Sequence, residues 1–192
     1  MAAGGKAWVS AVPSWRLLLE NVCVGMAYWG ISHLNYLLFS GIGVLPMPIW
    51  PAAALAIVTA FYRGWRIAPG IAAGTILANH YSLGGSWGYA VAISVMNAIG
   101  PLAGAALARR RVSLDLEIRG LGDIAFCFAA MVVLTPMLTA TGGIGSKWLL
   151  GLMPGSAVPA AWLKWAMAHA MGTVLFALPV FAWLAVGKGE EA

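Results

Sequence analysis

The sequence predicts an all-α fold, a polytopic transmembrane helical bundle of about six spans. Of the 192 residues, 61% are hydrophobic and only 9% are charged, and the mean hydropathy is +0.86. A soluble domain carries about 25% charged residues. The apolar segments are separated by basic or glycine-rich turns and extend over residues 15–39, 46–62, 67–81, 87–108, 123–141 and 159–186. We therefore expect one integral membrane domain over residues 1–192 and no nucleic-acid module.

The first apolar segment contains four polar residues, Glu20, Asn21, His33 and Asn35. No clear cleavage site follows it, so we interpret the segment as a retained helix rather than a signal peptide. Glu20 and Asn21 lie toward its inner end, where interfacial anchoring is the expected role.

Three prolines precede the second helix. Pro46, Pro48 and Pro51 fix their own φ angles and disfavour a helical conformation in the residue before, so the approach is predicted to be extended. The helix that follows rises only about 18 Å against roughly 30 Å of hydrocarbon. The run through Trp50 must therefore enter the membrane, where its backbone needs polar partners. We expect a dent in one face of the bundle, lined by Trp50, with Asn79 as the nearest candidate partner.

The later helices have their own boundary signals. Pro69 fits the first turn of the third helix, and the fourth helix stops at the basic run 109–111. Residues 113–122 form a connector that we expect at the surface. Pro136 lies within the fifth helix, and the glycine content of residues 142–158 predicts a loop before the sixth.

Basic residues are distributed unevenly between the two ends of the predicted spans. With six spans and both termini inside, nine of the 11 basic residues fall on the inner side, Lys147 lies in an outer loop, and Lys164 lies within the last helix. Cytoplasmic loops are enriched in Lys and Arg, so the asymmetry predicts that both termini are cytoplasmic. The inner set is Lys6, Arg16, Arg63, Arg66, Arg109, Arg110, Arg111, Arg119 and Lys188.

Two polar side chains have matching depths in the predicted bundle. Asn97 follows Trp87 by ten residues and His169 follows Pro159 by ten, so both lie about 15 Å below the outer surface. We predict that they lie within hydrogen-bond reach, directly or through one water. The pair can be structural, because interhelical hydrogen bonds contribute roughly 0.6 to 2 kcal/mol, or it can belong to a functional site.

Aromatic side chains at similar depth extend this pair into a candidate ligand-binding pocket. Trp162, Trp165, His169 and Gly172 share one helix face, at i, i+3, i+7 and i+10. Tryptophans near a membrane surface are also typical of the interfacial aromatic belt, and aromatic side chains can simply fill the dent, so these structural alternatives stay open. The candidate binding residues are Trp50, Asn79, Asn97, Trp162, Trp165 and His169, with His33, His80 and Lys164 at the rim.

No cofactor, metal or enzymatic activity is expected. The three histidines differ in depth, and no carboxylate or thiolate lies in the outer half of the bundle. Cys23 and Cys127 fall in apolar segments and are interpreted as buried thiols. The sequence has no Ser-His-Asp set, no paired carboxylates at depth and no phosphate loop.

Four stretches carry a family resemblance. They are MPIWPAAALA at residues 47–56, APGIAAGTILAN at 68–79, MNAIG through ALARR at 96–110, and WAMAHAMG through ALP at 165–179. In this order they resemble the bacterial membrane-associated sensor domain of the MASE type-one class. The sequence departs from the family pattern at two places, where His169 replaces an acidic residue and Ile99-Gly100 replaces a glutamate.

The resemblance implies a sensory or input role in the bacterial inner membrane. Members of the class generally have more spans and are fused to a histidine kinase, a diguanylate cyclase or a similar output module. This sequence contains no such module, which implies a truncated chain or a partner that supplies the output.

Three functions fit these observations. The first is a sensor or adaptor that binds a small ligand, a lipid or a partner membrane protein and signals to a cytoplasmic output partner. The alternatives are a structural accessory subunit of a larger pigment or redox complex, and a substrate-binding subunit of a small-molecule transporter. The expected partners are therefore membrane lipids and a membrane protein or output module. Identifying what co-purifies with the chain in mild detergent separates the three.

Overall fold

Helices contain most of the described residues of this computed structural model, which are residues 14–44 and 46–189, and no strand occurs among them. The predicted all-α fold is confirmed. Short 3-10 or π-helical turns, labelled η, join several of the helices. In chain order the elements are α1 Ser14–Gly41, α2 Ala52–Arg63, η1 Gly64–Ile67, α3 Ala68–Leu77, η2 Ala78–Ser82, α4 Trp87–Ala108, α5 Leu121–Phe128, η3 Ala129–Leu134, α6 Thr135–Leu149, η4 Gly155–Ala157, α7 Val158–Gly172, η5 Thr173–Ala177 and α8 Leu178–Gly189.

Three helical runs in the described part of the chain are long and apolar enough to cross a membrane. They are Trp87–Ala108, Leu121–Leu149 and Gly155–Ala185. α2 and α3 contain 12 and 10 residues, too few to span the hydrocarbon alone. A count of six spans therefore stays a prediction, although helices form in all six predicted segments.

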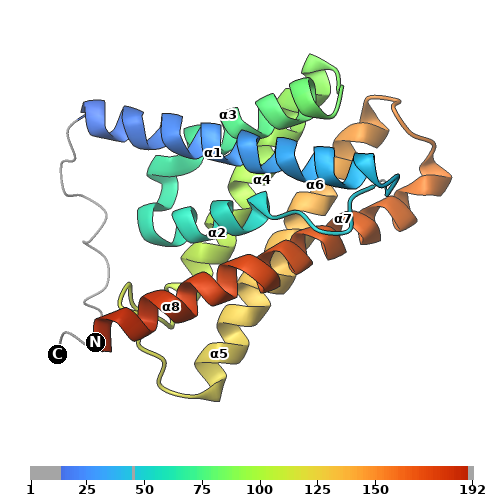
Figure 1. Cartoon of the computed structure of the whole chain (residues 1–192). Coiled ribbons are helices and arrows are strands. Elements are labelled where there is room, and N and C mark those ends of the chain that lie inside the picture. Colours follow the sequence, from blue (N-terminus) through green and yellow to red (C-terminus); the bar gives the residue numbers. More distant parts are fainter. Residues whose placement is uncertain (1–13, 45, 190–192) are drawn as a thin grey trace.

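Helix α4 passes through the middle of the bundle and packs against α2, α3 and α6 (Figure 1). α1 packs along α3, and α7 packs along α6. Figure 1 shows that α1 begins and α8 ends on the same side of the molecule, at the left of the view. Ser86 starts α4 as an N-cap, because its Oγ accepts a hydrogen bond from the Tyr89 N–H.

Two pairs of glycines allow the helices to approach closely. A Cβ at Gly74 would lie 2.6 Å from the Tyr28 Cβ on α1, and one at Gly70 would lie 2.6 Å from a backbone oxygen of α1. On α4, a Cβ at Gly100 would lie 2.7 Å from the Thr139 side chain of α6. The spacing of glycines at i and i+4 thus marks the α1–α3 and α4–α6 contacts.

Two long helical runs contain prolines that follow π-helical turns. Pro136 comes after η3, and Pro179 comes after η5. Proline donates no hydrogen bond and its ring clashes with the carbonyl four residues earlier, and a wider turn relieves that clash. Both helices therefore continue past their prolines.

The predicted loop at residues 142–158 is wrong over its first half, because α6 continues to Leu149. The glycines there serve packing. A Cβ at Gly143 would lie 3.0 Å from the Trp165 ring, and a Cβ at Gly142 would overlap the Met96 side chain. Glycine in this stretch permits close helix contact rather than a chain reversal.

The interpretation of both cysteines as buried thiols is wrong. Cys23 is exposed and Cys127 is half-buried. α1 buries Gly25, Tyr28, Ser32 and Asn35, and Cys23 lies outside that stripe. Its neighbours on the outer face are apolar and exposed, as expected for a helix that meets lipid: Leu18, Leu19, Val22 and Met26.

Candidate functional site

The segment before α2 brings non-helical backbone into the bundle. Residues 46–50 have no helical structure, and the Trp50 side chain is only 7% exposed. The Trp50 N–H donates a 2.9 Å hydrogen bond to the Ala168 carbonyl oxygen of α7. Asn35 Nδ2 of α1 donates a 3.0 Å bond to the Ile49 carbonyl oxygen. α1 and α7 thus supply the polar partners that this backbone needs.

The prediction that Asn79 satisfies this backbone is wrong. Asn79 Nδ2 donates to the Thr75 carbonyl oxygen in its own helix, at 2.9 Å, and the Asn79 carbonyl accepts from the Gly85 N–H. Asn35 takes the expected role with the same side-chain chemistry. Counting residues along a helix estimates height in the bundle but does not show which helix lies beside the segment.

Gly172 of α7 lies directly beneath the Trp50 backbone. A Cβ at Gly172 would overlap the Trp50 carbonyl group and lie 3.3 Å from the Pro51 nitrogen. Only glycine permits this contact without displacement of the segment. We refer to the contact of the Trp50 backbone with Ala168 and Gly172 as the Trp50 junction.

His169 lies between two indole rings at the Trp50 junction. Its ring stacks with Trp50 at a centroid distance of 6.1 Å and an interplanar angle of 23°, and with Trp165 at 5.3 Å and 13°. The Trp50 Nε1–H donates to the Tyr28 hydroxyl at 3.2 Å. These contacts join α1, the 46–50 segment and α7 in one aromatic cluster.

The hydrogen bonding of His169 assigns its tautomer. Nδ1 lies 3.2 Å from the Trp165 carbonyl oxygen, which can only accept, so Nδ1 carries the proton. In the neutral ring, Nε2 is then a bare acceptor. Nε2 is buried and has no hydrogen-bond partner among the described residues.

Asn97 faces the same place from α4. Its Oδ1 is a second buried acceptor without a partner in the described part of the chain, while its side chain also interacts with the Tyr28 hydroxyl. Asn97 and His169 line one cavity of about 10 Å³. The other lining residues come from α1, α2, α4, α6 and η5, and are Tyr28, Ala53, Ala56, Pro101, Thr135, Pro136, Thr139 and Thr173.

The predicted direct bond between Asn97 and His169 is absent, but the alternative through one water stays a prediction. A cavity of about 10 to 15 Å³ suffices for a single water, provided that polar partners surround it. A water donates two hydrogen bonds, and Oδ1 of Asn97 and Nε2 of His169 are both acceptors. The arrangement suits one bridging water.

The sequence was compared with models of known protein families, and the match covers all residues of this site. The sequence matches the MASE1 family over residues 19–189, which includes every residue of the Trp50 junction and of the cavity. The chain belongs to the MASE1 family. The resemblance predicted from the sequence is confirmed, and the family is one of membrane-associated sensor domains. No curated protein and no solved structure matches the chain.

In this MASE1 domain, the two α7 tryptophans that were predicted to line one pocket, Trp162 and Trp165, lie in different places. Trp165 stacks on His169 at the junction. Trp162 lies farther out and donates from Nε1 to the Thr141 hydroxyl of α6, at 3.1 Å. Trp162 therefore joins α7 to α6 and does not line the cavity.

The residues predicted for the rim lie away from the cavity. His33 pairs with Ser82 Oγ at 3.1 Å. His80 contacts the Gly85 carbonyl oxygen and stacks on Trp87 with ring centroids 3.8 Å apart, and Lys164 is exposed. Across the described residues, no three His, Cys, Asp or Glu side chains lie close enough to share a metal ion. The two outer histidines thus tie the η2 turn to its neighbours.

Three residues of the site were missed in the sequence: Tyr28, Asn35 and Gly172. Tyr28 and Asn35 belong to the buried stripe of α1, with Gly25 and Ser32. That stripe follows the i, i+3, i+7, i+10 spacing of one helix face, which could have identified it. Gly172 was placed on the helix face of Trp165 and His169 in the sequence, but its contact with the Trp50 backbone was not predicted.

Proposed function

We propose that the chain is the sensory input domain of a signalling system in the bacterial inner membrane, with both termini in the cytoplasm. The arginines that follow α2 and α4 gather at one end of the bundle, where Arg109 Nη1 lies 3.3 Å from the Phe61 carbonyl oxygen. α1 begins and α8 ends on this side (Figure 1). An even number of crossings with a basic inner face fits this arrangement. Lys6 lies outside the described residues, as does the side chain of Lys188.

The observation that carries the proposal is the Trp50 junction. A non-helical segment inside the bundle is held by tertiary contacts rather than by a continuous helix, and its contacts with α7 are the backbone bond to Ala168, the stack on His169 and the contact with Gly172. Such a contact can exist in two discrete arrangements, docked and displaced. A sensor needs an element of this kind, because a signal acts by shifting an equilibrium between states.

The helix that receives this segment leads to the cytoplasmic end. η4, α7, η5 and α8 form one helical run from Gly155 to Gly189, and the junction lies near its middle. The π-helical turn η5 begins directly after Gly172. Single π-helical turns occur frequently at functional sites. Displacement of the Trp50 segment would therefore change the position of α8, and α8 would pass the change to an output partner.

The unpaired polar atoms beside the junction favour a second arrangement. Asn97 Oδ1 and His169 Nε2 are buried without partners among the described residues. A buried unpaired polar group costs about 1 to 3 kcal/mol. A single bridging water satisfies both atoms and its loss restores that cost, so the hydration of this cavity would bias the junction between its two states.

The size of the cavity favours a signal that arrives from the membrane. About 10 Å³ holds one water, whereas small-molecule sites usually measure about 300 to 1,000 Å³. We infer that the input is a lipid or a partner membrane protein that contacts the outer surface of α1 or α7. Exposed apolar side chains cover these surfaces, among them Leu34, Leu38, Leu163 and Met167.

The test joins the full chain at its C-terminal end to a reporter output enzyme in bacterial membranes. Gly172→Ala displaces the Trp50 segment, while Gly145→Ala adds the same methyl group to α6 where no atom lies within 4 Å. We expect Gly172→Ala to change reporter output about fivefold, as 1 kcal/mol of bias does. Gly145→Ala should leave the output unchanged. A Gly172→Ala protein that inserts and folds but signals like the wild type contradicts the proposal.

A further inference from the structure

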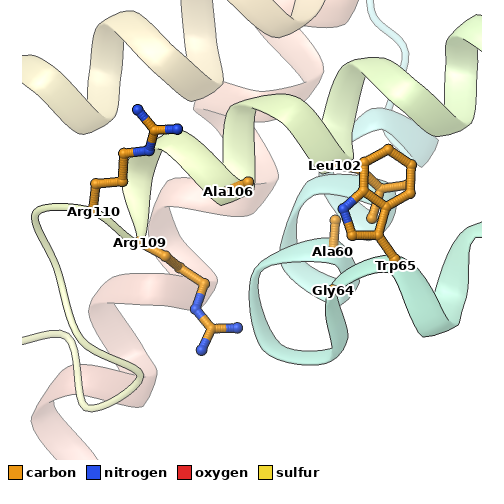
Figure 2. A pocket seen from close by; sticks show the side chains of 7 residues that line it. All are labelled: Ala60, Gly64, Trp65, Leu102, Ala106, Arg109 and Arg110. Carbon is orange, nitrogen blue, oxygen red and sulfur yellow. The ribbon is translucent and has the colours of Figure 1, made fainter. Parts of the chain in front are cut away.

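A second hollow, far larger than the cavity at His169, lies at the basic end of the bundle. It measures about 370 Å³ and opens between the end of α2, the η1 turn and the last turns of α4. Figure 2 shows the side chains that line it, with Trp65 on one side and Arg109 and Arg110 at the end of α4. We call this feature the α2–α4 hollow. Nothing in the proposed sensory mechanism uses it.

The floor of the α2–α4 hollow is apolar and consists of small or fully packed side chains. Ala60 is 1% exposed and Leu102 is 2% exposed. The turn at Gly64 has a φ of 60°, which favours glycine. Ala60 and Gly64 contribute no large side chain to the hollow, and Trp65, the large side chain of η1, lies at one side of it (Figure 2).

The cations of the hollow come from α4. The Arg109 side chain extends toward α2, where its Nη1 donates to the Phe61 carbonyl oxygen at 3.3 Å (Figure 2). Partial burial lowers the pKa of the Arg109 guanidinium, as expected for a cation that has lost part of its hydration. Arg110 is exposed and extends to the other side of the helix end. No acidic side chain lines the hollow among the described residues.

An exposed tryptophan also lines the α2–α4 hollow. Trp65 is 61% exposed and lies between Arg63 and Arg66 in the chain. Tryptophan beside basic residues is typical of the level of the lipid headgroups. Glu20, the acidic residue at this end of α1, is already paired with Arg63. Arg109 and Arg110 are the charged side chains that line the hollow, beside its apolar floor.

We propose that the α2–α4 hollow binds an anionic phospholipid from the adjacent leaflet. The phosphate would lie against Arg109, the exposed Arg110 side chain would turn toward the headgroup, and an acyl chain would follow Leu102 and Ala106 along α4. The shape and chemistry match this ligand, because basic pockets between helices on the cytoplasmic side recognise anionic headgroups. A hollow of this size also falls within the usual range for ligand sites.

The test measures lipid retention by the full chain in mild detergent. The protein is titrated with phosphatidylglycerol and, separately, with phosphatidylcholine, and bound lipid is counted by native mass spectrometry. We expect phosphatidylglycerol to bind at least about tenfold more tightly, the change that two cationic contacts produce. Equal affinity for the two lipids overturns the proposal.

Two double variants that remove the same charge distinguish lipid binding in the hollow from general attraction to the basic end of the bundle. Arg109→Gln with Arg110→Gln should abolish the preference for phosphatidylglycerol. Arg111→Gln with Arg119→Gln removes the same charge from arginines that do not line the hollow, and should preserve the preference. Equal losses in both double variants mean that binding is non-specific and contradict the proposal.

Two further measurements test the apolar wall of the hollow and the source of the phosphate group. Ala106→Leu fills the exposed wall of the hollow without changing charge, and should weaken phosphatidylglycerol binding even if the arginine variants fold poorly. Glycerol 3-phosphate tests a soluble source of the same phosphate group. If it displaces the lipid at equal concentration, the hollow recognises a free anion and the lipid proposal is wrong.

Discussion

The backbone nitrogen of Trp50 lies 2.9 Å from the carbonyl oxygen of Ala168, so the segment before α2 is hydrogen-bonded directly to α7. The side chain of the next residue on α7, His169, stacks on the Trp50 ring. Backbone and side-chain contacts of the same two elements therefore reinforce each other. This double contact gives a short non-helical segment a defined position inside the bundle.

Gly172→Ala should destabilise the protein by about 1 to 3 kcal/mol, the usual cost of overpacking a filled interior. The reason is the overlap of the new methyl group with the Trp50 carbonyl. Thermal unfolding in detergent, followed by tryptophan fluorescence, measures the effect.

The matched control for that measurement is Gly145→Ala. Its new methyl group meets no atom within 4 Å, and alanine is the better helix former by roughly 0.5 to 1 kcal/mol. We expect a neutral or slightly stabilising effect. Equal melting shifts for the two variants would refute the close contact at Gly172.

Trp50→Ala should cost about 3 to 5 kcal/mol, because it empties a buried site that the indole fills. Trp50→Phe keeps most of the volume and loses only the hydrogen bond to Tyr28, so about 1 kcal/mol is expected. Chemical unfolding of the two variants side by side checks the order. A Trp50→Ala protein as stable as the wild type would mean that Trp50 contributes nothing to the packing.

Asn97 and His169 should be energetically coupled by roughly 0.5 to 1.5 kcal/mol if one water bridges them. His169→Leu alone should cost about 1 kcal/mol or more, because the bridging water at Asn97 Oδ1 then loses its acceptor at His169 Nε2. A double-mutant cycle with Asn97→Leu measures the coupling. Additive effects of the two substitutions would exclude the bridge.

The topology can be tested with single cysteines in a background that lacks Cys23 and Cys127. Leu152→Cys lies in the exposed turn after α6, and Glu117→Cys lies in the exposed connector after α4. With both termini cytoplasmic, an impermeant thiol reagent added to intact cells should label the first and spare the second. The reverse labelling pattern would invert the proposed orientation.

Hydropathy and the basic run at residues 109–111 predicted the fourth helix well. The fourth helix was predicted at residues 87–108 and is observed at Trp87–Ala108, because Ser86 caps its start and a basic run follows its end. Residues 142–149 were mispredicted as loop, since glycine is equally suited to a turn and to a close helix contact.

The depth of the site residues in the bundle could be predicted from the sequence, but the helices that they contact could not. Equal depth brought together Asn97 and His169, which do line one cavity. The same reasoning named Asn79 as the partner of the Trp50 segment, whereas Asn35 donates to it, because depth alone does not fix which helix packs beside the segment. The contact of Gly172 with Trp50 joins residues far apart in sequence, and the helix-face pattern that contains Gly172 does not show it.

Under the proposed function, displacement at the Trp50 junction moves α8. The direct measurement is the distance between spin labels on Leu18→Cys of α1 and Trp183→Cys of α8, both exposed, in a background without Cys23 and Cys127. Pulsed electron spin resonance in lipid nanodiscs compares the unsubstituted junction with Gly172→Ala and with Gly145→Ala. The account predicts a shifted distance distribution for Gly172→Ala and an unchanged one for Gly145→Ala. An unchanged distribution in a folded Gly172→Ala protein would contradict it.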